Sequence, residues 1–181
     1  MGKRSDFKRM ERDYYPTPKK ALEPLADWLN DHNEEGWFAE PCYGAGDLAD
    51  ALVSMTDLQC GFACDIEPQD VRIEQRDALS TTLDDFGHCD YVITNPPWSR
   101  DVLHPMITHF SALKPTWLLF DADWMHTVQA KPFLPWLDII ISVGRIKWIP
   151  GTKYTAKDNC CWYLFDQSRD PSFSTEFIGR Q

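Results

Sequence analysis

The sequence contains no apolar run of about 18 residues, the length that a membrane-spanning helix requires. Its first twenty residues are polar and basic, without the apolar segment of a secretory signal peptide. We therefore expect a soluble, cytoplasmic protein with no membrane partner. A chain of 181 residues is long enough for one domain with a substantial core.

Regular cysteine and histidine spacings are also missing. The six cysteines include no C-x-x-C pair and none of the spacings of a zinc or disulfide framework. Most stand in apolar, strand-like stretches, where a reduced cysteine behaves as a small hydrophobe. Among the five scattered histidines, His104 and His109 are five residues apart, which does not place both on one helix face. We expect reduced core thiols and no metal site.

Positive charge is scarce: 18 Lys and Arg against 28 Asp and Glu give a net charge of −10. Residues 1–20 hold seven basic and three acidic side chains, a balance of +4, which leaves −14 for the remaining chain. An acidic body disfavours a broad, nonspecific grip on duplex DNA, because phosphate contacts dominate that affinity. Residues 1–12 are predicted to be a basic arm. Two interpretations of it stay open: a disordered, solvated terminus and a local nucleic-acid contact.

Strand-like stretches alternate with helical patterns along the chain. Thr17 as N-cap and Pro18 at the first helical position predict a helix that Pro24 should kink or break. Two further helices are predicted at 46–55 and 101–113. Strands are predicted at 36–41, 59–66, 70–78, 89–94, 116–122, 137–143 and 160–166. This alternation favours a doubly wound, Rossmann-like α/β fold: a seven-stranded, mostly parallel sheet with helices on both faces and the last strand antiparallel.

Ligands of such sheets bind beyond the carboxyl ends of the strands, and chemically informative residues stand there. The first predicted strand runs into EPCYGAGDL, where Gly44 and Gly46 allow a tight turn and a close ligand approach. The full G-x-G-x-x-G dinucleotide fingerprint is missing. Glu40 would repel a pyrophosphate but attract an ammonium group. Asp65 and Asp77 follow the second and third predicted strands, where carboxylates can accept from ribose hydroxyls and an adenine amine.

The fourth predicted strand ends in Asn95-Pro96-Pro97-Trp98. Two prolines cannot donate ladder hydrogen bonds, so the strand must stop there. Taken alone this is an ordinary turn, but the glycine loop and acids at the neighbouring strand ends indicate a ligand site. The Asn95 side-chain oxygen and the Pro96 carbonyl can accept both hydrogens of an exocyclic amine. That would localise the lone pair of a poor nucleophile.

EPCYGAGDL, CDI, RDAL and NPPW, in this order and spacing, resemble the motifs of class I S-adenosylmethionine-dependent methyltransferases. More narrowly, they resemble those of phage-type DNA adenine-N6 methyltransferases. DYYPTP at 13–18 resembles the segment that closes over the methionine end of the cofactor, and residues 144–166 resemble the tail of the small phage-type enzymes. The resemblance spans roughly 13–166 and implies one methyltransferase domain, 13–181, with S-adenosylmethionine as cofactor. There is no room for a separate target-recognition domain, so we expect short or relaxed site specificity, or a partner that supplies it.

The resemblance also implies a role for each matching residue. Thr17 would hold the carboxylate of the cofactor and Glu40 would face its amino group. Trp98, where Tyr is commoner, would stack on a base that is flipped from duplex DNA or offered on a single strand. The implied catalytic residues are Asn95, Pro96, Pro97 and Trp98. The implied cofactor-binding residues are Tyr15, Thr17, Glu40, Pro41, Gly44, Gly46, Asp47, Asp65, Ile66, Asp77 and Ala78.

Residues that would contact the acceptor are sought in SRDVLHP (99–105) and in the more basic stretch KWIPGTKYTAKDN (147–159). Its basic and aromatic side chains suit phosphates and bases, although a solvated surface loop fits the same pattern. The predicted substrate-binding residues are Trp98, Lys147, Trp148, Lys153 and Lys157. Asn-Pro-Pro-aromatic also serves enzymes that methylate glutamine amides or guanine amines of RNA. A protein or RNA acceptor therefore stays open beside DNA, as does a catalytically silent nucleic-acid or partner-binding module.

Overall fold

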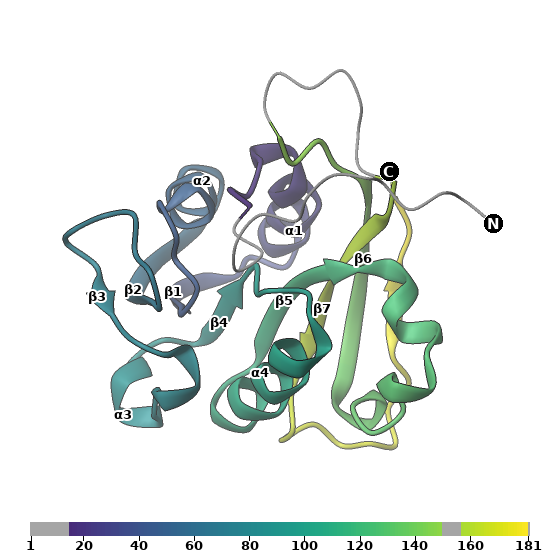
Figure 1. The fold of residues 1–181 in the computed structure, drawn as a ribbon. Helices are drawn as coiled ribbons and strands as arrows, with labels where there is room; N and C mark the ends of the chain where they lie inside the picture. The colour runs from purple at the N-terminus through teal and green to yellow at the C-terminus, as the bar shows by residue number, and fades with distance from the viewer. Residues whose placement is uncertain (1–14, 150–156, 181) are drawn as a thin grey trace.

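The computed structural model describes residues 15–149 and 157–180. Its strands form one eight-stranded sheet in the order β3-β2-β1-β4-β5-β7-β6-β8 (Figure 1). The strands are β1 (Glu35–Glu40), β2 (Asp57–Asp65), β3 (Glu74–Gln75), β4 (Tyr91–Thr94), β5 (Thr116–Asp121), β6 (Leu137–Arg145), β7 (Asn159–Phe165) and β8 (Glu176–Ile178). The order reverses between β1 and β4, which makes this pair the switch point of the sheet.

Strand direction follows the prediction. β1 pairs in parallel with β2 and β4, and β3 and β5 extend the parallel region on either side. β7 runs antiparallel between β5 and β6, so the mostly parallel sheet with an antiparallel last predicted strand is confirmed. β8, which is parallel to β6 at the sheet edge, was not predicted. It is three residues long and mostly exposed, so no apolar alternation marks it in the sequence.

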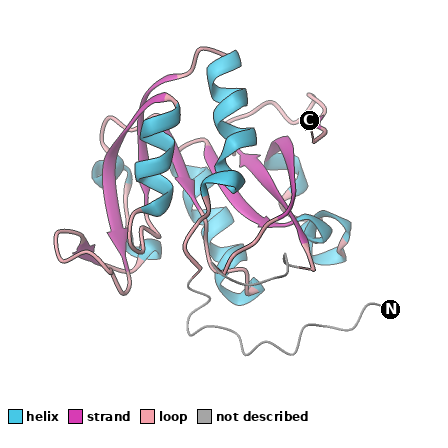
Figure 2. Cartoon of the chain, turned by 90° about the horizontal axis from the view of Figure 1, so that it is seen from above, coloured by secondary structure: helices cyan, strands magenta, loops and turns pink. Residues whose placement is uncertain are grey.

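Helices cover both faces of the sheet, as predicted (Figure 2). α1 (Lys19–Asp31) and α2 (Asp47–Met55) contribute to one core cluster, whereas α3 (Leu83–Phe86) and α4 (Arg100–Leu113) contribute to the other. β5 serves both: Trp117 and Leu119 join the first cluster, and Leu118 and Phe120 join the second. This division follows from the period-2 alternation of side chains along a strand. Short 3₁₀ helices lie at η2 (Ala78–Ser80), η3 (Ala122–His126), η4 (Val128–Ala130) and η5 (Leu134–Trp136).

The first helix differs from the prediction at two points. The N-cap is Pro18, not Thr17, and no side chain of the described residues caps the helix. The helix continues through Pro24, so the predicted break is wrong, whereas the alternative of a kink stays a prediction. Proline there removes one backbone hydrogen bond, and the buried apolar face of α1, including Leu22 and Leu25, still packs on the core.

The third predicted strand is shorter than expected. Only Glu74–Gln75 of the predicted 70–78 pairs with β2, because turns and bends occupy residues 70–73. All six cysteines are free, and Cys64, Cys89, Cys160 and Cys161 are buried. Within residues 15–149 and 157–180, no helix is both long and apolar enough to cross a membrane.

Candidate active site

A cavity of about 810 Å³ lies at the carboxyl ends of β1, β2 and β4, which is the switch point of the sheet. Its wall combines residues 15–17, the turn after β1, the end of β2, η2, the turn after β4 and the start of α4. Twelve of the predicted site residues line it: Tyr15, Thr17, Glu40, Pro41, Gly44, Asp47, Asp65, Ile66, Asp77, Ala78, Asn95 and Pro97. The six segments, which are distributed over residues 15–106, therefore meet where the fold favours ligand binding.

The turn after β1 is shaped by two glycines with positive φ angles. The φ angle is 57° at Gly44 and 91° at Gly46, a region that other residues adopt at a cost. Gly44 lines the cavity, whereas Gly46 does not and instead precedes α2 as its N-cap. A Cβ at residue 46 would lie 2.5 Å from the Tyr43 hydroxyl oxygen. Gly46 therefore matters for the shape of the turn.

Asp65 ties this turn to the end of β2. One carboxylate oxygen accepts from the Gly44 amide at 2.8 Å, and the other accepts from the Glu67 amide at 2.7 Å. A carboxylate has about four acceptor positions, so these bonds leave acceptor capacity for ligand hydroxyls. Asp77 is exposed on the cavity wall, and its side chain also accepts from the Leu79 amide at 2.9 Å.

Among the acidic side chains that line the cavity, Glu40 is the buried one. It is 1% exposed, and its Oε2 atom has no hydrogen-bond partner among the described residues. Burial raises the pKa of this carboxyl well above its usual value, and the nearby carboxylate of Asp65 adds to the shift. Because an unpaired buried charge is costly, a carboxylate in this position favours a cationic ligand group.

Asn95 lies at the end of β4 and is held by three neighbours. Its Nδ2 donates to the Thr17 hydroxyl at 3.1 Å and to the Tyr15 carbonyl at 3.5 Å. Its Oδ1 accepts from the Trp98 indole N–H at 3.3 Å, and that N–H is shared with the Leu119 carbonyl at 3.1 Å. The catalytic candidate is thus linked to the segment that begins at residue 15.

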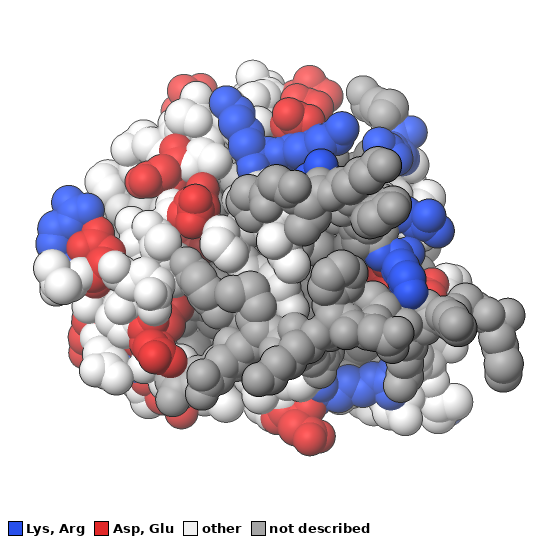
Figure 3. All heavy atoms as spheres, turned by 45° about the horizontal axis from the view of Figure 1, so that its top comes forward, with Lys and Arg blue, Asp and Glu red and all other residues white. Residues whose placement is uncertain are grey.

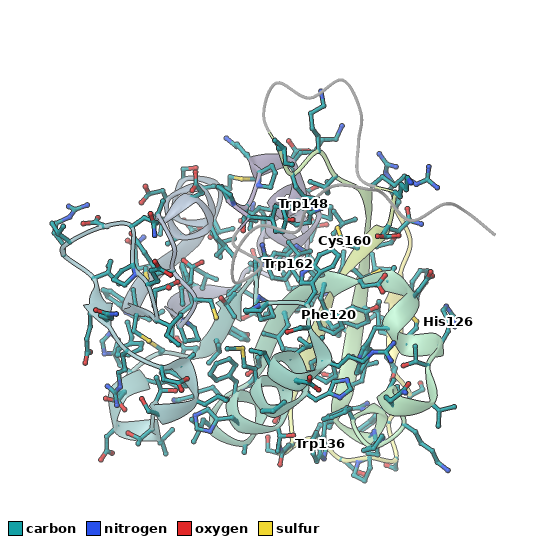
Figure 4. The ribbon with its side chains drawn as sticks, in the orientation of Figure 1. Phe120, His126, Trp136, Trp148, Cys160 and Trp162 are labelled. Atoms are coloured by element: carbon teal, nitrogen blue, oxygen red, sulfur yellow. The ribbon has the colours of Figure 1, made fainter. Side chains whose placement is uncertain are left out.

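The remaining predicted residues do not line the cavity. Pro96 is buried, and Trp98 lies beside the cavity with its ring centroid 5.5 Å from that of Trp148, edge to face. Trp148 packs on the core cluster that contains α1 residues (Figure 4), and Lys147 beside it is exposed. Lys157 is exposed too, and Lys153 lies outside the described residues.

The first turns of α4 are a further part of the wall. Ser99, Asp101 and Val102, from the stretch 99–105 that was considered for the acceptor, line the cavity together with Met106, which was not considered. They reach it because α4 directly follows the NPPW turn, at the carboxyl end of a strand.

The cavity is strongly acidic. Six carboxylate side chains line it, and no lysine or arginine of the described chain does: Glu40, Asp47, Asp65, Glu67, Asp77 and Asp101. Across residues 15–149 and 157–180, no three His, Cys, Asp or Glu side chains are grouped so that they could hold a metal ion. The acidic wall therefore suits a ligand with cationic groups and hydroxyls.

No family model matches the sequence, and no curated protein matches it. Solved structures do share the fold. A proposed class I S-adenosylmethionine-dependent methyltransferase from Listeria monocytogenes matches with a TM-score of 0.65 at 13% identity, over 90% of this chain and 65% of that one. A proposed RNA methyltransferase from Pyrococcus horikoshii matches with a TM-score of 0.57 at 15% identity, over 86% of this chain and 87% of that one.

A third match is the modification subunit of a proposed type I restriction enzyme from Vibrio vulnificus, with a TM-score of 0.50 at 11% identity. It covers 92% of this chain but 47% of that subunit, so this chain spans about half its length. The chain therefore has the α/β fold of these methyltransferases.

Proposed function

We propose that the protein transfers the methyl group of S-adenosylmethionine to the exocyclic N6 amine of adenine in DNA. One observation carries the proposal: the buried carboxylate of Glu40, whose Oε2 atom has no partner among the described residues, and the amide of Asn95 line the same cavity, from the ends of adjacent strands. The first suits a cationic amino group, and the second suits an amine that must be oriented for attack.

The cavity residues fit the proposed cofactor. Glu40 would accept from its ammonium group, which would give the buried Oε2 atom the partner it lacks among the described residues. Asp65 would accept from its ribose hydroxyls, and Asp77 from its adenine amine. Gly44 allows the backbone to approach it closely. When bound, the cofactor supplies a methyl group on a sulfonium, which a nitrogen nucleophile can displace in line.

The chain's contribution to the transfer would be orientation of the acceptor amine. Three hydrogen-bonding positions of the Asn95 amide are used, and one lone pair of Oδ1 stays open. That lone pair would accept one hydrogen of the amine, and the Pro96 carbonyl would accept the other. Both hydrogens would then leave the ring plane and the nitrogen lone pair would point at the methyl group. The N–C bond forms as the S–C bond breaks, and the nitrogen afterwards releases one proton.

The distribution of cations supports a nucleic-acid acceptor. On the β3 side of the sheet, Arg72 pairs with Asp70 at 2.6 Å and Arg76 pairs with Asp85 at 2.8 Å. Near the NPPW turn the pattern differs. Five described basic residues at the start of α1, the end of β6 and the C-terminal segment form no ion pair with another described residue: Lys19, Lys20, Arg145, Lys147 and Arg180. Figure 3 shows blue side chains toward the β6 and C-terminal side of the molecule, where phosphates would be attracted.

An enzyme that methylates DNA must also select its site. The chain spans about half of the type I modification subunit whose fold it shares. We propose that DNA sequence is read by a partner, or by the residues 147–157 that follow β6, including Lys153. Trp148 would place an aromatic ring near the base, since its ring contacts that of Trp98.

The test is methyl transfer from labelled S-adenosylmethionine to unmethylated duplex and single-stranded DNA, with structured RNA and cell protein as parallel acceptors. The DNA is digested and its nucleosides are identified by mass. We expect N6-methyladenine with the wild-type protein and none with Asn95→Ala. Label only in RNA or protein would overturn the DNA acceptor. Cofactor binding without transfer to any of these acceptors would support a silent binding module.

Two further sets of substitutions distinguish residues that bind the cofactor from residues that bind the DNA acceptor. Asp65→Asn should weaken cofactor binding by about tenfold or more, because a charge-assisted hydrogen bond contributes roughly 1.5–3 kcal/mol. Lys19→Ser with Lys20→Ser should weaken DNA binding and flatten its salt dependence, with unchanged cofactor affinity. Lys114→Ser with Lys131→Ser removes the same charge away from the cavity and is the matched control.

A further inference from the structure

The hydrogen bonds around Asn95 determine which way its side-chain amide faces. An amide can be turned by 180° with little change of shape, which exchanges its oxygen and its nitrogen. The Thr17 hydroxyl does not distinguish the two orientations, because it can donate or accept. The indole N–H of Trp98 can only donate and the Tyr15 carbonyl can only accept. If the Asn95 amide were turned, its NH₂ group would face the indole N–H of Trp98, and its oxygen would face the carbonyl oxygen of Tyr15.

The position of the Trp98 indole is itself fixed by two contacts. Its N–H also bonds to the Leu119 carbonyl of β5 at 3.1 Å, and its ring packs edge to face on Trp148. Trp98 is half-buried and does not line the cavity. Its N–H points at Asn95 and β5, so the polar part of the ring is already used.

We propose that Trp98 is a positioning residue: its indole N–H holds the Asn95 amide so that the open Oδ1 lone pair serves the acceptor amine. This inference rests on the proposed role of Asn95. It differs from the base stacking that the family resemblance implies for this position. Phenylalanine would keep a ring at residue 98 but lose the N–H, so the two roles can be separated by substitution.

The hydrogen bond can be tested without any methyl acceptor. In ¹H–¹⁵N spectra, the indole resonance of Trp98 is assigned from its loss in Trp98→Phe. We expect Asn95→Ala to shift this resonance and to speed its exchange with solvent. Asn95→Asp keeps an oxygen acceptor and should retain slow exchange. A Trp98 resonance that is unchanged by Asn95→Ala would overturn the proposal, whether or not DNA is the acceptor.

The functional consequence is tested by kinetics with the acceptor that the wild-type protein methylates. Trp98→Phe should lower kcat on the order of 10–100-fold, because misplacement of an orienting group acts on the transition state. The KM for the acceptor should change little. Trp136→Phe removes an indole N–H at the opposite end of the sheet (Figure 4) and should leave both constants unchanged. Unchanged kcat in Trp98→Phe, or a loss confined to KM, would support stacking and refute positioning.

Discussion

Replacing Glu40 by Gln separates two consequences of burying a carboxylate that has one oxygen without a partner among the described residues. Burial raises the pKa of the Glu40 carboxyl, and nearby acidic side chains, first Asp65, raise it further. A carboxyl whose pKa is higher in the folded than in the unfolded chain weakens the fold once the pH exceeds the unfolded value. The loss is about 1.4 kcal/mol for each pH unit between the two pKa values. Gln has the same shape and does not titrate.

Glu40→Gln should therefore be more stable than the wild-type protein at neutral pH without ligand. A gain on the order of 1 kcal/mol would raise Tm by about 2–4 °C in a domain of this size. The wild-type protein loses stability as the pH rises from about 4.3, the ordinary pKa of Glu, through the raised folded pKa. The advantage of the variant should thus be small at pH 4 and should grow above it.

The same substitution should weaken S-adenosylmethionine binding by roughly 10–100-fold, because a charge-assisted hydrogen bond contributes about 1.5–3 kcal/mol. Thermal unfolding between pH 4 and 8 measures the stability, and calorimetric titration measures the affinity. Glu23→Gln, at an exposed position of α1, is the matched control and should change neither. A variant that melts with the wild-type pH dependence would refute the burial argument. Unchanged affinity would remove Glu40 from the cofactor site.

Two predictions concern the scaffold around the cavity. Gly46→Ala should destabilise the fold by about 1–3 kcal/mol, because residue 46 has a φ of 91° and an added Cβ would meet the Tyr43 ring. Gly179→Ala, which meets nothing within 4 Å, is its control, and equal Tm values for the two variants would contradict the prediction. The hydrogen bond from Arg76 lowers the pKa of Asp85 to about 2. The stability that the ionised Asp85 carboxylate contributes should therefore be lost as the pH falls from about 4 toward 2. In acid titrations followed by circular dichroism, Arg76→Gln should lose less stability than the wild-type protein between about pH 4 and pH 2. An equal loss of stability in the two proteins would contradict a stabilising Arg76–Asp85 pair.

Much of the fold was predictable because its signals are local. Alternating apolar stretches specify strands, and proline pairs or glycine turns end them, so most core elements were predicted from the sequence. A parallel sheet brings the carboxyl ends of its strands to one edge. The cavity positions of Glu40, Asp65 and Asn95 therefore follow from their places in the sequence. β8 and the short 3₁₀ helices carry no comparable pattern, because they are short and only partly buried.

The sequence by itself determined the alternation of strands and helices and the polar residues that end the strands, since both depend on chain periodicity and turn chemistry. Only the tertiary structure showed the order of the strands in the sheet. It also decided which partners the polar residues meet. The bond between Asn95 and Thr17 joins residues 78 positions apart, and the bond from Trp98 to Leu119 joins the turn after β4 to β5. The same holds for Glu40, because the burial of its Oε2 atom without a partner among the described residues depends on packing from several elements. Such contacts depend on how distant segments fit together, which no local pattern records.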